Sequence, residues 1–438
     1  MERLILLLNI VLIVQVEASF STDAANIRSM RLLDASYDPA VRPNDTVYVK
    51  AGFNLLTIDS VDIKQQSLTV TGWITLEWID QRLQWDPENY TSKIEEVHCL
   101  PSEIWKPEII IDNSLEDIGV INDENLQLIV KYNGHVEWEP PGLFTTHCEI
   151  DITYYPFDRQ KCIIELTSWS HTKEQLEIIH RTSEVNIENF RLNGEWILDR
   201  TEIDYTDLQV TKSDGTIVTF SQIEFVFVLE RRPVFYVINV ILPIILASFL
   251  SCVVFLVPLQ SGEKVAYILT LILAIAVLLS LIADSVPHTS LTASVLGIYL
   301  AFTLFISVIC ALLTVLLLNI FHKDEKLDTT SFIYKFTEFI NRKRCTERSK
   351  TKNASNPKTA GNRIVPSRTL TVVTYETMDV RTDEKSDKVD KCEEKVYTRK
   401  EMANILDRFC FWVFVTLTFI GTISFLAALS MGAKKHHT

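Results

Sequence analysis

One run of apolar residues, 265–283, limits what this chain can fold into more than any other segment. The run carries no charge and lies between the Glu263-Lys264 pair and Asp284. As an α-helix it would rise about 28 Å, which is close to the hydrocarbon thickness of a bilayer. The run therefore predicts a membrane-spanning helix.

One narrow stripe of this helix is smaller and more polar than the rest. At about 100° per residue, the stripe and its flanks hold both hydroxyls of the segment and the carboxylates at its two ends. The eight positions are Glu263, Ala266, Thr270, Leu273, Val277, Ser280, Leu281 and Asp284. For the helix alone two interpretations stay open: the stripe lines water, or its small and hydroxylated residues pack against another helix.

Three further hydrophobic runs are long enough to cross a bilayer. They lie within residues 233–262, 291–321 and 409–431. Residues 1–19 contain Arg3, an apolar run and a small-residue end, which is typical of a cleaved signal peptide. An exported N-terminal part and four crossings together place both mature termini outside. We therefore expect domains at 20–232 outside, 233–321 with three spans, 322–408 inside, and 409–438 with the fourth span and a short outer tail.

The predicted outer domain, residues 20–232, is rich in short alternating runs separated by turn signals. Asn133-Gly134, Asn193-Gly194 and Asp214-Gly215 are the clearest of these turns. Many short strands in a domain of this size favour an all-β, immunoglobulin-like sandwich. Two glycosylation sequons begin at Asn44 and Asn89, which agrees with export.

Charge separates the outer and inner parts of the chain. Acidic residues outnumber basic ones in residues 20–232, which argues against nucleic acid as a partner and favours cations. The inner segment 322–408 has a basic excess and begins with apolar residues at helical spacing between 332 and 340. That helix either lies on the membrane surface or packs as a soluble helix. Residues 341–391 are polar and poor in aromatic residues, so we expect a partly disordered insert.

Neither a cofactor site nor an active site is predicted. The sequence has no phosphate-binding loop, nucleophile elbow or zinc-protease motif. The dipeptides His98-Cys99 and His147-Cys148 are too sparse to predict a zinc site. Only three cysteines lie in the outer domain, so at most one disulfide forms within it and one thiol is left over.

A loop signature then identifies a family. Cys148 and Cys162 enclose thirteen residues that include Tyr155, Pro156, Phe157 and Asp158. This loop resembles the signature loop of the Cys-loop receptors, the pentameric ligand-gated ion channels, and is most similar to their nicotinic branch. Further motifs agree in the right order: Trp105-Lys-Pro-Glu108, Pro140-Pro-Gly142, Ser168-Trp-Ser170, 231–236 and Gly262-Glu-Lys264. The resemblance covers nearly all of residues 24–431 apart from the polar insert.

This resemblance implies a Cys148–Cys162 disulfide, a pentamer of identical or homologous subunits, and a pore lined by the helix at 263–284. Glu263 and Asp284 would form the inner and outer carboxylate rings, which favour cations, and lipid would surround the outer helices. Leu273 and Val277 would form apolar collars that gate the pore. The implied location is the plasma membrane, with a postsynaptic membrane as one option.

The resemblance also implies a ligand site between subunits. Trp169 and Phe220 match aromatic positions on one side, and Trp73 matches the aromatic residue of the neighbour. Aromatic faces attract small cationic ligands by cation–π contact. Three acidic residues depart from the family pattern or surround the site: Asp112, Glu137 and Glu139. Asp112 stands where the family commonly has tyrosine, and it is either a ligand contact or a solvated turn carboxylate.

Coupling between site and pore is expected at the inner end of the sandwich. The resemblance places 155–158 against the outer linker that contains Pro287, and it suggests an ion pair between Asp62 and Arg232. Two alternatives to an autonomous cation channel stay open. The chain is an accessory subunit whose incomplete ligand site does not open alone, or it is an adhesion module anchored by four spans.

Overall fold

The computed structural model describes residues 20–30, 36–116, 121, 125–285, 293–323, 335–337, 339 and 398–435. The chain divides into two compact units. The first comprises Met1–Ile244, Val277–Ala301 and Thr422–Thr438, and the second comprises Ile245–Ala276 and Phe302–Gly421. The predicted signal peptide, Pro287 and the polar insert lie outside the described residues.

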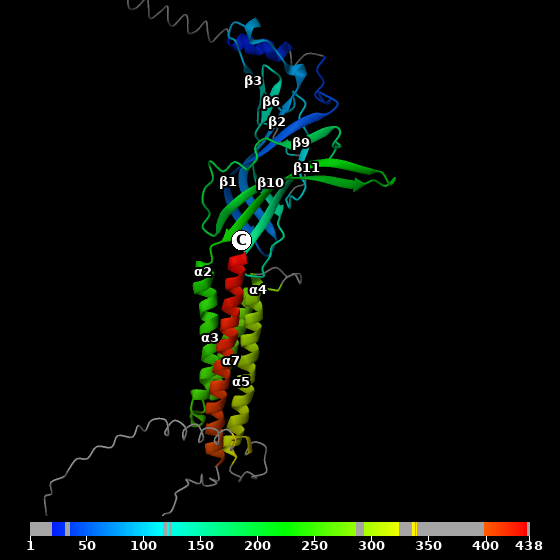
Figure 1. Cartoon of the computed structure of the whole chain (residues 1–438). Helices are drawn as coiled ribbons and strands as arrows, with labels where there is room; N and C mark the ends of the chain where they lie inside the picture. Colours follow the sequence, from blue (N-terminus) through cyan, green and yellow to red (C-terminus); the bar gives the residue numbers. More distant parts are fainter. Residues whose placement is uncertain are drawn as a thin grey trace, which may run out of the picture. The chain divides into compact units, whose positions relative to one another are not determined.

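Two β-sheets form the N-terminal part of the first unit (Figure 1). The larger has seven strands and runs β3 (Glu96–Cys99), β5 (Leu128–Lys131), β6 (His135–Trp138), β2 (Ser67–Ile79), β1 (Val47–Asp62), β9 (Leu176–His180), with β7 (Pro141–His147) also paired to β2. The smaller has four and runs β10 (Trp196–Thr211), β11 (Ile217–Arg231), β8 (Arg159–Ser168), β4 (Ile109–Ile111). The predicted all-β sandwich is therefore confirmed.

Alternation along the strands builds the core between these sheets. In β1, Val47, Val49 and Ala51 are buried while the residues between them are exposed. The Phe53 ring lies 5.7 Å from both the Phe225 and the Phe227 ring, so aromatic residues of both sheets meet. Each fully buried side chain of this size contributes about 1.5–3 kcal/mol. The alternate, outward-pointing positions of these strands form the surfaces that are described below.

Two of the predicted turns join consecutive strands. Asn133-Gly134 connects β5 to β6, and Asp214-Gly215 connects β10 to β11. Both glycines have positive φ, 81° at Gly134 and 84° at Gly215, a region that favours glycine. A Cβ at Gly134 would lie 2.5 Å from the Asp80 carbonyl oxygen, so this turn also has no room for a side chain.

Four helices are long and apolar enough to cross a membrane: Val234–Leu256, Lys264–Asp284, Val295–His322 and Arg399–Gly432. The first is built from α2 (Val234–Tyr236), a π-helical turn η3 (Val237–Ile241), α3 (Leu242–Val253) and η4 (Val254–Leu256). The others are α4 (Lys264–Asp284), α5 (Val295–His322) and α7 (Arg399–Lys435). Short 3₁₀ turns are η1 (Gln81–Leu83), η2 (Pro87–Asn89) and η5 (Leu259–Ser261). The four predicted spans are confirmed.

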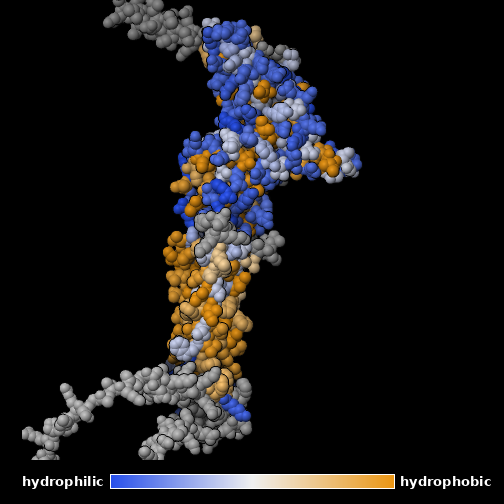
Figure 2. Space-filling model, viewed as in Figure 1, coloured by the Kyte–Doolittle hydropathy of each residue, from blue (hydrophilic) through white to orange (hydrophobic). Residues whose placement is uncertain are grey.

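Hydropathy distinguishes these helices from the sheets. Figure 2 shows a mostly hydrophobic surface over the helices and a mostly hydrophilic one over the strands. In the second unit, Phe255 and Phe414 stack with centroids 5.5 Å apart, and Ile268 of α4 is fully buried. One side of α4 is thus fixed by packing within its own chain.

Candidate functional site

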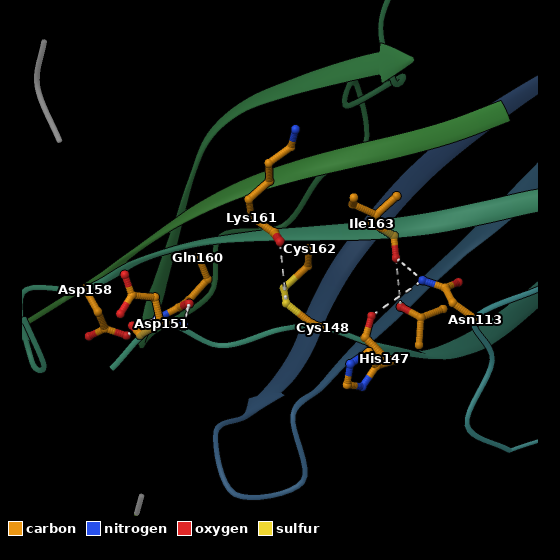
Figure 3. The surroundings of a disulfide bond; sticks show 10 residues. Asn113, His147, Cys148, Asp151, Asp158, Gln160, Lys161, Cys162 and Ile163 are labelled. Carbon is orange, nitrogen blue, oxygen red and sulfur yellow. Dashed lines mark hydrogen bonds between the residues drawn. A yellow bond between two sulfur atoms is a disulfide. The ribbon is translucent and has the colours of Figure 1, made fainter. Parts of the chain in front are cut away.

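A disulfide closes the signature loop. Cys148 directly follows β7, Cys162 lies on β8, and their sulfur atoms are bonded (Figure 3). Asn113 holds the neighbouring backbone: its Nδ2 donates to the Ile163 carbonyl at 2.8 Å and its Oδ1 accepts from the Glu165 N–H at 3.2 Å. The predicted Cys148–Cys162 pairing is confirmed.

The loop between these cysteines contacts the ends of two helices in the first unit. The Thr153 carbonyl accepts a hydrogen bond from the Val295 N–H at 3.0 Å, at the start of α5. Gly432 of α7 lies against the Tyr154 ring, since a Cβ there would come within 2.3 Å of a ring carbon. A movement of this loop would therefore act directly on the ends of both helices.

A buried ion pair joins the loop to the last residue of β11. Arg231 Nε lies 2.8 Å from Asp158 Oδ1 and Arg231 Nη2 lies 3.1 Å from Asp158 Oδ2, and the two side chains are 0% and 1% exposed. Glu195 Oε1 accepts a further hydrogen bond from Arg231 Nη1 at 2.5 Å. Burial alone lowers the pKa of Arg231, but the hydrogen bonds and charge of Asp158 outweigh it, so the pKa is raised. The guanidinium stays charged.

Aromatic rings enclose this guanidinium. Its carbon lies 4.1 Å from the Trp196 ring centroid, 5.2 Å from that of Tyr155 and 5.3 Å from that of Tyr236. The Tyr236 hydroxyl donates to Glu195 Oε1 at 2.8 Å, which links the start of the first membrane helix to the same cluster. Sequence reasoning missed Glu195, Trp196 and Tyr236 as members of this cluster. Their only sequence signal is that Glu195-Trp196 follows the Asn193-Gly194 turn and that Tyr236 closes the 231–236 motif.

The predicted ion pair between Asp62 and Arg232 is absent from the ion pairs of the described residues. Asp62 Oδ1 instead accepts from the N–H groups of Lys64 and Gln65, both at 2.9 Å, in the turn after β1. Arg232 is exposed, and its N–H donates to the Glu195 carbonyl at 2.8 Å. Successive residues of an extended chain point to opposite faces, so only Arg231 enters the buried cluster.

The region around Trp169 forms the candidate ligand surface of the smaller sheet. Trp169 follows β8 and is 67% exposed in the single chain. The next residue, Ser170, is hydrogen-bonded to Glu108 and lies 2.9 Å from His171 Nδ1. Phe220 is half-buried on β11, opposite Leu208 of β10. The structure thus brings the Trp105–Glu108 and Ser168–Ser170 motifs together beside an open indole face.

An acidic group of Asp112, Glu165 and Glu224 lies on the same sheet. Glu165 and Glu224 are directly opposite in the β8–β11 pair, and the Asp112 N–H donates to the Glu165 carbonyl at 2.9 Å. Burial raises the pKa of Glu165, and the charges of Glu224 and Asp112 raise it further. Sequence reasoning missed Glu165 and Glu224. Their signal was weak: each is one of several polar residues in its strand.

The neighbour-facing candidates lie on the larger sheet. Trp73 is half-buried on β2, while Glu137 and Glu139 flank the buried Trp138 and point outward. Glu137 is held by Lys131 Nζ at 3.3 Å and by Arg181 Nη2 at 3.5 Å. Thr75 Oγ1 donates to Glu139 Oε1 at 2.9 Å. Both carboxylates are therefore partly engaged by their own chain.

One chain does not bring the two candidate sets together. Trp169, Phe220 and Asp112 belong to the four-stranded sheet side, and Trp73, Glu137 and Glu139 to the seven-stranded one. Among the described residues no hydrogen bond or ion pair joins the two sets. A site that uses both sets requires a second chain.

The eight stripe positions of α4 share one property. All of them are exposed in the single chain, including Leu273 at 65% and Val277 at 51%. The buried positions of α4 follow a different stripe: Lys264, Ile268, Ile275 and Ile282. Glu263 immediately precedes α4, and its carbonyl accepts the Tyr267 N–H at 2.9 Å. Among the described residues, the stripe that carries the hydroxyls is thus left exposed.

The remaining candidates have simple environments. Asn44 and Asn89 are exposed, as an attached glycan would need. Cys99 is fully buried, and burial raises the pKa of its thiol to about 12, so it is unreactive. The described residues contain no group of three or more His, Cys, Asp or Glu that could hold a metal ion.

Comparison with known proteins agrees with this geometry. Residues 27–233 match the neurotransmitter-gated ion-channel ligand binding domain, and residues 240–401 match the neurotransmitter-gated ion-channel transmembrane region. The neuronal acetylcholine receptor subunit alpha-4 of Mus musculus is 32% identical over 311 residues, 70% of this chain and 48% of that protein. The subunit alpha-5 of Homo sapiens is 28% identical over 404 residues, 88% of this chain and 83% of that protein.

This chain spans about half the length of the alpha-4 relatives that it matches. The two family matches together nevertheless take in the sandwich, the first three membrane helices and the start of the fourth. The chain therefore belongs to the neurotransmitter-gated ion channels, as a nicotinic receptor-like subunit and not as an enzyme.

Proposed function

We propose that this chain is a subunit of a pentameric ligand-gated cation channel of the plasma membrane. The sandwich and both mature termini are extracellular, and residues 322–408 are cytoplasmic. A small cationic ligand binds between the sandwiches of neighbouring subunits and opens a pore lined by α4.

One observation carries the pore: the small, hydroxylated and acidic positions of the stripe all lie on the exposed side of α4, whereas the opposite stripe is buried. A ring of such helices encloses water, because each neighbour presents the same stripe inward. Carboxylates at Glu263 and Asp284 then repeat as two rings that attract cations. Leu273 and Val277 repeat as apolar collars that exclude water when the ring narrows.

The proposed ligand site is supported by the negative charge and the exposed aromatic surface of the smaller sheet. The open face of Trp169 is suited to an ammonium group, and the acidic group of Asp112, Glu165 and Glu224 gives the same sheet negative potential. Trp73 of a neighbouring subunit would complete the site, since one chain holds the two sets on separate sheets. Between site and pore, the loop with Tyr155, Pro156, Phe157 and Asp158 transmits the change through Arg231 and the ends of α5 and α7.

The proposal is tested by expressing the chain alone and recording membrane current during application of small amines. We expect an inward current that W169A weakens more than W169F, because phenylalanine keeps a ring face. Loss of a desolvated cation–π contact of about 2 kcal/mol raises the half-activating concentration about 30-fold. A sensitivity unchanged by W169A would overturn the ligand assignment.

A second candidate is an accessory subunit that conducts only beside homologous subunits. The observation that favours it is that Lys131 and Arg181 partly engage Glu137, which makes this carboxylate less available to a ligand. This candidate predicts surface expression with no amine response when the chain is alone, and current when a nicotinic subunit is co-expressed. Current from the chain alone would exclude it.

A further inference from the structure

A buried ion pair connects α4 to α7 in the second unit. Lys264 Nζ lies 2.6 Å from both carboxylate oxygens of Asp407. The Lys264 side chain is 0% exposed and that of Asp407 is 8% exposed. The same ammonium lies 5.8 Å from the centroid of the Phe255 ring, so a protein environment encloses it.

Stability alone is a poor explanation for this pair. Removing two charges from water costs several kcal/mol, and a well-packed apolar pair often holds two helices equally well. A buried ion pair is therefore weak evidence for stability, and its position in the molecule is more informative.

Its position is directly behind Glu263. Lys264 follows Glu263 in sequence, but Glu263 is exposed while Lys264 lies on the buried stripe of α4. A lysine that turned toward the exposed side would place a positive charge beside the carboxylate and cancel much of its field. Asp407 prevents this in two ways: it holds the ammonium on the buried side, and it neutralises the charge there.

We propose that Asp407 is a specificity-determining residue for cation permeation although it does not line the pore. It binds Lys264 from behind α4 and so leaves the full charge of Glu263 available to permeating cations. The inference rests on the proposed function, in which Glu263 forms a carboxylate ring.

The test is single-channel recording of D407N in receptors that contain this chain. The unpaired lysine charge should lower the cation conductance about twofold or more and raise the relative chloride permeability. The double variant K264M/D407N removes both charges and should restore both quantities. T418V is the matched control on the same helix: it removes a polar contact of 3.3 Å with Cys252 Sγ but no charge, and it should leave conductance unchanged.

Unchanged conductance and permeability in D407N channels would overturn the inference. If D407N does not reach the surface, the exchanged pair K264D/D407K decides, because it keeps a buried pair and removes the lysine from α4. Cation conductance equal to or above that of the wild type supports the inference, and a lower one overturns it. Wild-type currents that reverse at the chloride potential would instead overturn the proposed function, before any variant is compared.

Discussion

Arg231 is the residue on which most contacts at the inner end of the sandwich converge. It pairs with Asp158 from the disulfide loop, with Glu195 at the foot of β10, and with three aromatic rings. It also ends β11, three residues before the first membrane helix begins at Val234. A change in the disulfide loop therefore reaches that helix through one side chain.

R231Q and R232Q form a matched pair. Loss of one partner of a buried ion pair costs about 3–5 kcal/mol, because the Asp158 carboxylate is left without a counter-charge. We expect R231Q to lower the thermal midpoint of the detergent-solubilised receptor strongly and R232Q to leave it nearly unchanged. Fluorescence-detected size exclusion after heating measures both. Equal effects would contradict the assignment of Arg231 as the buried partner.

Glu165 gives a pH-dependent prediction. Its pKa is raised in the folded chain, so the folded state binds its proton more tightly than the unfolded state does. The contribution of Glu165 to stability is therefore best at low pH and is lost as the pH rises through the folded pKa. E165Q should raise the thermal midpoint at pH 7 and have a smaller effect at pH 4.5. The exposed glutamate Glu188 provides the control: E188Q should change neither midpoint, and the same result for E165Q would refute the prediction.

At the scale of elements, α4 has a buried side and an exposed side that both run along its length. Its buried stripe packs on its own chain and fixes the rotation of the helix, so the other stripe is presented outward. Rotation by half a turn would bury hydroxyls and expose Ile268 and Ile275.

The variants V277C and I275C, which lie two residues apart on α4, test the rotation of this helix. An impermeant, charged thiol reagent applied from outside during agonist exposure should block current through V277C channels, because in the proposed pore this side chain faces the conducting water. I275C should be insensitive, because the native isoleucine is 2% exposed. Block of I275C with no effect on V277C would show that the helix is turned the other way.

Sequence patterns predicted elements well because those patterns are local. Alternation predicted the strands, and long uncharged runs predicted the four spans. Contacts between residues that are far apart in the sequence were not predicted in this way. Lys264 and Asp407 are 143 positions apart, and nothing near either residue indicates the other. Arg231 and Arg232 look alike in sequence, and only the packing of Trp196 and Asp158 distinguishes them.

At the scale of the whole molecule, a single chain is incomplete in two places. The aromatic residues of the candidate ligand site are divided between two sheets, and the described part of the chain leaves the polar stripe of α4 exposed. Sequence reasoning proposed Trp169 and Trp73 from family resemblance and the stripe from helical periodicity, and all three remain predictions. It could not weigh the acidic residues, because whether Glu137 is free depends on Lys131 and on Arg181 from a distant segment. The proposed ring of subunits would resolve both gaps at once.

The reversal potential of agonist-evoked current under diluted external NaCl tests the cation pore most directly. A pore lined by Glu263 and Asp284 predicts a reversal potential that moves negative with the sodium gradient. Substitution E263Q should reduce this shift, because it removes one charged ring and keeps the side-chain size. A reversal potential that moves positive with the chloride gradient would contradict the account.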